Sequence, residues 1–134
     1  MKANELRIGN YVNIEGDVVK VKEIYEKSIH YANGAYESYA TEDFIQPIEL
    51  TGDILIDIGF KKGYNEIYSK TIKVDFYEYN ISYQNVKDNK YSFVAYGYKN
   101  GELKRQIILD NIQYLHELQN VFFSFTNQEL EIKL

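Results

Sequence analysis

Three turn-forming dipeptides, each between two runs that alternate apolar and polar residues, constrain this chain of 134 residues most strongly. The dipeptides are Gly16-Asp17, Asn33-Gly34 and Asn100-Gly101. Alternation with a period of two is typical of strands with one buried face, and Asn-Gly is the pair that best supports a two-residue hairpin turn. The sequence therefore predicts three antiparallel hairpins, formed by residues 11–15 with 18–26, 28–32 with 35–40, and 90–98 with 102–109.

The run over 18–26 also predicts which of its side chains face the core. Strict alternation places Val19, Val21 and Tyr25 on one face and Ile24 on the other, beside the lysines. With three or four short strands in the first fifty residues, we expect a small, strongly bent sheet or barrel-like unit there.

The middle of the chain changes from strand to helix periodicity and back. Thr51 is a suitable N-cap for a short helix over 52–58, and Gly59 is a suitable C-terminal stop. Alternation then returns and predicts further strands of a second sheet over 64–69, 71–79 and 80–84.

The longer helix is predicted near the C-terminus. Its apolar residues are three or four positions apart and share one face: Ile112, Leu115, Leu118, Phe122 and Phe125. Asp110 and Gln113 suit a capping box before this stripe, and Thr126-Asn127 suits its end. Residues 129–134 are expected to form a last short strand or a docked tail.

These elements predict an α+β fold with antiparallel strands in two groups, one short helix and one longer C-terminal helix. A length of 134 residues fits a single domain, residues 1–134, that needs no disulfide, and cysteine is absent. No apolar run is long enough to cross a membrane, and the first residues lack the apolar core of a signal peptide. We therefore expect a cytoplasmic protein that does not act at a membrane.

Residues that could carry catalysis or hold a metal are scattered. His30 and His116 have no second ligand at metal spacing, so a structural or exposed role is predicted for both. Asp53 and Asp57 share one helix face, but no third acid nearby completes a cation site. Glycine loops for phosphate and the serine-nucleophile elbow are missing. We predict no enzymatic activity, no cofactor and no metal site.

Tyrosine is the outlier in composition, with 14 residues in a chain that has no tryptophan. Its side chain offers a large, rigid contact area with a polar tip. Six tyrosines of the second sheet, interleaved with cations, form the candidate binding surface: Tyr77, Tyr79, Tyr83, Tyr91, Tyr96 and Tyr98, with Lys99, Lys104 and Arg105. Packing of the same tyrosines in a core is the competing interpretation.

The charge balance bears on the kind of partner. The formal net charge is −5, from 15 basic and 20 acidic residues, and most of the excess acid lies in the first 50 residues. Affinity for phosphate backbones comes mostly from clustered cations, so nucleic acid is the weaker candidate. We predict another protein as the partner, and single-stranded nucleic acid on the Tyr/Lys sheet face as the alternative. The oligomeric state is left open.

Three stretches of the sequence carry a resemblance to a known family. They read KANELRIGNYV near the start, QPIELTGDILIDIGF in the middle and YLHELQNVFFSFTNQELEIKL at the end, together 47 of 134 residues. In these stretches the chain resembles a family of small proteins widespread in Bacteroidetes genomes, their prophages and other mobile elements. The family has no known activity, so the resemblance implies no functional residues. It implies a phage or mobile-element setting, in which we expect a modulator or inhibitor of a host system.

Overall fold

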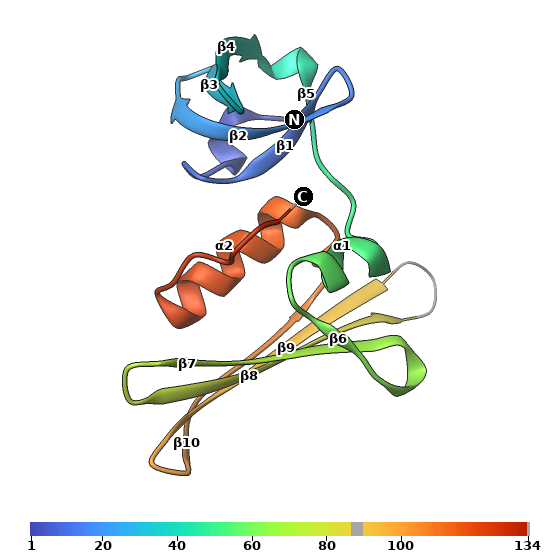
Figure 1. Cartoon of the computed structure of the whole chain (residues 1–134), viewed down its shortest axis with the longest axis vertical. Helices are drawn as coiled ribbons and strands as arrows, with labels where there is room; N and C mark the ends of the chain where they lie inside the picture. The colour runs from blue at the N-terminus through green and yellow to red at the C-terminus, as the bar shows by residue number, and fades with distance from the viewer. Residues whose placement is uncertain (87–89, 134) are drawn as a thin grey trace. The chain divides into compact units, whose positions relative to one another are not determined.

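The computed structural model describes residues 1–86 and 90–133, and of residues 85, 86, 90 and 91 it describes the backbone alone. These residues form two antiparallel sheets of five strands each and two α-helices, so the predicted α+β class is confirmed (Figure 1). The chain divides into two compact units. Unit 1 comprises Met1–Glu49 and Tyr114–Asn120, and unit 2 comprises Leu50–Gln113 and Val121–Leu134. That the whole chain folds as a single domain stays a prediction.

Unit 1 is a meander of short strands: β1 (Tyr11–Ile14), β2 (Asp17–Ile24), β3 (Ser28–Asn33), β4 (Tyr36–Thr41) and β5 (Ile45–Gln46). The order in the sheet is β4-β3-β2-β1-β5, because a 3-10 turn at Glu42–Phe44 leads the chain from β4 to the far side of β1. The two predicted N-terminal hairpins are thus confirmed, but each predicted turn is off by one residue. The turns are Glu15-Gly16 and Gly34-Ala35, because Ile14 pairs with Asp17 and Asn33 pairs with Tyr36. Their inner faces enclose the core of unit 1, which contains Ala3, Leu6, Val12, Ile14, Val19, Val21, Ile29, Ala40 and Ile45.

A β-bulge in β2 changes which side chains reach this core. The pairing of β2 with β3 shifts between Val21 and Glu23, so the residues after the bulge face the opposite way from strict alternation. Ile24 packs against the core, while Tyr25 is 44% exposed. The prediction that Tyr25 shares the inner face with Val21 was wrong, because one extra residue reverses the phase of the strand.

Two buried amide side chains attach the first half of α2 (Leu115–Thr126) to unit 1. Gln119 is 1% exposed; its Oε1 accepts from the Tyr11 N–H at 2.9 Å and its Nε2 donates to the Gly9 carbonyl at 3.1 Å. Asn10 Nδ2 donates to Asn120 Oδ1 at 2.8 Å. The two bonds of Gln119 satisfy the Gly9 carbonyl, in the segment before β1, and the N–H of Tyr11, the first residue of β1.

Unit 2 contains the longer strands: α1 (Gly52–Asp57) is followed by β6 (Lys61–Lys62), β7 (Ile67–Val74), β8 (Tyr77–Val86), β9 (Lys90–Lys99) and β10 (Glu102–Asp110). These strands lie in chain order, with β10 and β6 at the two edges. One face of the sheet is covered by α1 and by the second half of α2, from which Phe122 and Phe125 are buried (Figure 1). The short helix begins as predicted, because Thr51 Oγ1 accepts from the Ile54 N–H at 3.2 Å.

Three sequence predictions in and around unit 2 were wrong in detail. The strand over 71–79 is two strands, because a hairpin turn at Asp75-Phe76 lets Val74 pair with Tyr77. Residues 64–66 form a 3-10 turn before β7 rather than the start of a strand. Asp110 caps no helix, because β10 continues through it opposite Ser92. In the described part of 129–134 there is no strand, and Leu130 is buried as expected of a docked tail.

Candidate functional site

Two of the predicted surface tyrosines belong to the core of unit 2. Tyr79 and Tyr83 are 3% and 1% exposed, respectively. The Tyr79 ring meets Phe125 edge-on at 5.4 Å, and the Tyr83 hydroxyl donates to the Ile112 carbonyl at 2.7 Å. Packing in a core, and not a role in a binding surface, therefore accounts for Tyr79 and Tyr83. Tyr79, Ile81 and Tyr83 alternate onto the face of β8 that the helices of unit 2 cover.

Three more members of the predicted surface contact one another at the end of the same face. Arg105 lies over the Tyr77 ring at 5.4 Å and donates from Nη1 to the Phe125 carbonyl at 3.1 Å. Lys99 Nζ is 5.9 Å from the centre of the Tyr77 ring. These cations already have aromatic and carbonyl partners within unit 2, which reduces what they offer to a phosphate.

The remaining members lie elsewhere. Tyr96 and Tyr98 alternate onto the opposite sheet face, partly exposed, with ring centres 6.5 Å apart. Lys104 forms an ion pair with Glu102 at 3.0 Å. The side chain of Tyr91 lies outside the described residues. The structure thus splits the described members of the predicted tyrosine surface between two faces of the sheet.

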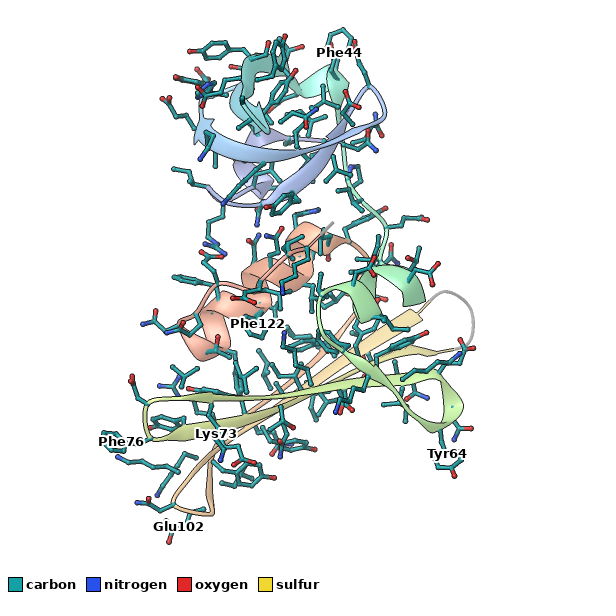
Figure 2. The ribbon with its side chains drawn as sticks, in the orientation of Figure 1. Phe44, Tyr64, Lys73, Phe76, Glu102 and Phe122 are labelled. Carbon is teal, nitrogen blue, oxygen red and sulfur yellow. The ribbon has the colours of Figure 1, made fainter. Side chains whose placement is uncertain are left out.

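Unit 1 carries a second group of aromatic side chains, which the sequence analysis did not single out as a site. Its most exposed members are Tyr25, Tyr36, Tyr39 and Phe44, with 44%, 64%, 65% and 53% of their surface accessible. Figure 2 shows Phe44 projecting from the surface of unit 1. The available signal was the tyrosine-rich hairpin around Asn33-Gly34. Its second strand has aromatic residues at both an odd and an even position, so at least one must face away from the core.

A groove of about 370 Å³ lies on the inner side of this hairpin. Its walls come from the β1–β2 turn, from β3 and β4 and from the 3-10 turn after β4. The lining residues are Ile14, Glu15, Tyr31, Tyr36, Ser38, Tyr39, Ala40, Thr41 and Phe44. The groove combines aromatic side chains with the polar side chains of Glu15, Ser38 and Thr41, so an extended peptide would find both apolar contacts and hydrogen-bonding groups there.

The strand beside this groove is an unpaired edge. Among the described residues β4 pairs only with β3, and its register with β3 is regular over all six residues. It contains no lysine, arginine or proline. Edge strands are usually protected by such residues or by a bulge, as β10 is by a register shift next to Lys104 and Arg105. The edge of β4 therefore retains backbone donors and acceptors that can bind another strand.

On the outer face of unit 1, strand register brings Glu23, His30 and Tyr39 into one row across β2, β3 and β4. His30 stacks on Tyr39 at 4.9 Å, and its Nδ1 lies 3.1 Å from Glu23 Oε1. Tyr25 adds a second tyrosine ring, 6.2 Å from that of Tyr39, and donates its hydroxyl to Glu23 Oε2 at 2.9 Å. Glu37 Oε1 lies 3.8 Å from His30 Nε2. We call these five residues the outer row.

The outer row contains two carboxylates, those of Glu23 and Glu37. The hydrogen bond to Glu23, with the nearby negative charge, raises the pKa of Tyr25 above its usual value. Unit 1 has five basic and ten acidic residues, a formal charge of −5, whereas unit 2 has ten of each. The whole net negative charge of the protein therefore belongs to the unit that carries the groove and the outer row.

His116, in the part of α2 that belongs to unit 1, is a buried titratable group. It is 4% exposed, stacks on Tyr114 at 5.9 Å, and its Nδ1 has no hydrogen-bond partner among the described residues. Burial lowers the pKa of this imidazole, and the charge of Glu5 opposes that effect in part. The predicted structural role fits this environment.

Among the described residues, no group of three or more His, Asp or Glu side chains is placed to hold a metal ion. Neither α-helix in that part of the chain has the length and apolar character needed to cross a membrane.

Comparison of the chain with protein-family models, with curated proteins and with solved structures found no match. The function is therefore inferred from the geometry of the β4 edge, the groove and the outer row of unit 1.

Proposed function

We propose that this chain is a non-enzymatic protein-binding protein whose unit 1 takes up an extended segment of another protein along β4. The observation that carries the proposal is the position of the free β4 edge, between the aromatic groove on one side and the outer row on the other. A strand added to an edge gains backbone hydrogen bonds, and its alternating side chains reach both faces. Here both faces offer exposed aromatic side chains.

A second copy of the same chain is a poorer occupant of this edge than a different protein. Pairing of two β4 edges would bring together two units of charge −5, each with Glu37 on the strand itself. Like charges opposed across paired strands are destabilising. Charge complementarity favours a segment with a net positive charge.

Nucleic-acid binding, the alternative function, gains no support from the described geometry. Tyr79 and Tyr83 are buried, and Arg105 and Lys99 contact the Tyr77 ring. A salt-dependent complex with a labelled single-stranded oligonucleotide would favour it. The phage or mobile-element setting stays a prediction from the resemblance, and a modulator of a host protein is one form that peptide binding would take.

The proposal is tested by selecting binders to the full-length protein from a display library of random peptides. We expect selected peptides to bind about tenfold or more weakly to Tyr36→Ser and Phe44→Ser, because both side chains line the groove. Both residues are more than half exposed, so these changes should leave the fold intact.

The matched control is Tyr64→Ser, since Tyr64 is 93% exposed but belongs to unit 2 (Figure 2). Binding to this variant should equal that of the wild type. The proposal fails if no peptide is selected, or if the two groove variants bind as tightly as the wild type.

A further inference from the structure

The outer row has the chemistry of a site for one particular kind of side chain. We propose that the outer row selects an arginine of the bound segment, an inference that rests on the proposed peptide uptake along β4. The guanidinium would stack on Tyr39 and pair with Glu37.

Tyr39 provides an open aromatic face at the β4 edge. One side of its ring is occupied by His30, at 4.9 Å and 29° between planes, yet the side chain remains 65% exposed. A tyrosine ring attracts a cation placed over its face, and arginine does this more often than lysine because its planar group can also stack. An arginine of an added strand whose side chain points to the outer face would therefore find a stacking surface beside the edge of β4.

The two carboxylates of the outer row have different tasks. Both oxygens of Glu23 are engaged, Oε1 with His30 and Oε2 with Tyr25, so Glu23 holds the rings in place. The side chain of Glu37 is 55% exposed, and its Oε1 lies 3.8 Å from His30 Nε2, a distance too long for a good hydrogen bond. Glu37 therefore keeps the capacity to accept a guanidinium, on the strand that the peptide would join.

Ring arrangement separates arginine from a quaternary ammonium ligand. Cages for methylated ammonium groups enclose the cation between several rings. In the outer row Tyr25 and Tyr39 lie 6.2 Å apart with 41° between their planes, and Tyr39 is stacked on His30. The rings thus contact one another and leave outward faces free, an arrangement that suits a flat guanidinium.

The experiment compares the peptides that one display library yields on three baits: the wild type, Glu37→Gln and Glu49→Gln. Glu37→Gln removes the carboxylate charge while keeping the shape of the side chain. Glu49 is an exposed acid of unit 1 outside the outer row, so Glu49→Gln changes the net charge equally and serves as the control. We expect arginine to be enriched at one fixed position with the wild type and Glu49→Gln, and this enrichment to be lost with Glu37→Gln.

A synthetic pair then tests the guanidinium itself. The arginine of a selected peptide is replaced by citrulline, its neutral isostere, and in a second peptide by trimethyllysine. We expect both replacements to weaken binding about tenfold or more on the wild type, and citrulline to have little effect on Glu37→Gln.

The outcomes separate the two proposals. Peptides that depend on Tyr36 and Phe44 but show no arginine enrichment, or bind citrulline equally well, leave groove binding standing and overturn the arginine site. Tighter binding of trimethyllysine than of arginine also overturns it. If no peptide is selected at all, the proposed function itself fails.

Discussion

At the scale of single residues, burial decides what each tyrosine and histidine does. Tyr83 and Tyr39 are the same residue type in similar alternating strands, yet one is 1% exposed and hydrogen-bonded to a carbonyl, and the other is 65% exposed. His30 and His116 differ likewise: the first lies between two carboxylates at the surface, and the second is buried, with an Nδ1 that has no hydrogen-bond partner in the described part of the chain. Residue type therefore gives the chemistry available, and the environment selects which part is used.

The lowered pKa of His116 makes a prediction about stability and pH. The ordinary value is 6.5 and burial lowers it in the folded state, so the unfolded chain binds the proton more readily. The contribution of a neutral His116 is present above about pH 6.5 and is lost as the pH falls towards the folded-state pKa. We expect the free energy of unfolding of the wild type to fall more steeply below about pH 6.5 than that of His116→Phe, as measured by urea denaturation.

His30→Gln is the control for this comparison. It removes the other histidine and leaves His116 in place, so it should keep the steeper pH dependence. Equal slopes for the wild type and His116→Phe would show that His116 is protonated equally easily in both states.

At the scale of elements, turns and bulges decide which face a side chain occupies. The bulge in β2 reverses the phase after Val21 and brings Tyr25 beside Tyr39. The turn at Asp75-Phe76 ends β7 and leaves Phe76 79% exposed at the tip of the hairpin (Figure 2). Both features depend on one or two residues within a continuous alternating pattern.

The turn between β7 and β8 yields a prediction for stability. Asp75 adopts a φ of 55°, in the left-handed region that costs a residue with a β-carbon roughly 1–2 kcal/mol and costs glycine little. We expect Asp75→Gly to be more stable than Asp75→Ala by about 1 kcal/mol, which corresponds to roughly 3–4 °C in Tm for a chain of this size. Thermal unfolding followed by circular dichroism measures the difference. An alanine variant as stable as the glycine variant would contradict the assigned turn.

At the scale of the whole molecule, the chain distributes charge and elements unequally between its two units. Unit 1 has all of the net negative charge and the exposed aromatic groove, whereas unit 2 is balanced in charge. The C-terminal segment contributes to both: residues to Asn120 belong to unit 1, and residues from Val121 belong to unit 2. Neither unit is therefore a continuous piece of the sequence.

This interleaving predicts the effect of truncation. A chain that ends at residue 113 loses Gln119 and Asn120 from unit 1 and the buried Phe122 and Phe125 from unit 2. We expect it to lose the dispersed amide signals of a folded protein in a proton–nitrogen NMR spectrum, over both units. A chain that ends at residue 130, which keeps the buried Leu130, should stay folded. Native-like signals for residues 11–46 in the shorter chain would show that unit 1 folds without its C-terminal segment.

The aromatic side chains of the candidate site lie on and beside a hairpin that the sequence predicts. The hairpin around Asn33-Gly34 was predicted correctly, with the tyrosines that now form the surface of unit 1. The sequence nevertheless predicts the binding surface in unit 2, because six tyrosines cluster there along the chain. Periodicity assigns a side chain to one of two faces, but it does not say which face a helix will cover.

The sequence by itself determined the α+β class, the two groups of antiparallel strands and the short helix with its Thr51 cap. These depend on alternation, turn dipeptides and capping residues, which act between neighbours in the chain. Only the tertiary structure decided that Tyr79 and Tyr83 are buried, that Tyr25 joins Tyr39, and that β4 is a free edge. Those outcomes depend on strand order, on a bulge and on the helix that packs on each sheet. Such contacts between distant residues are set by the packing of complete elements, and no local pattern encodes them.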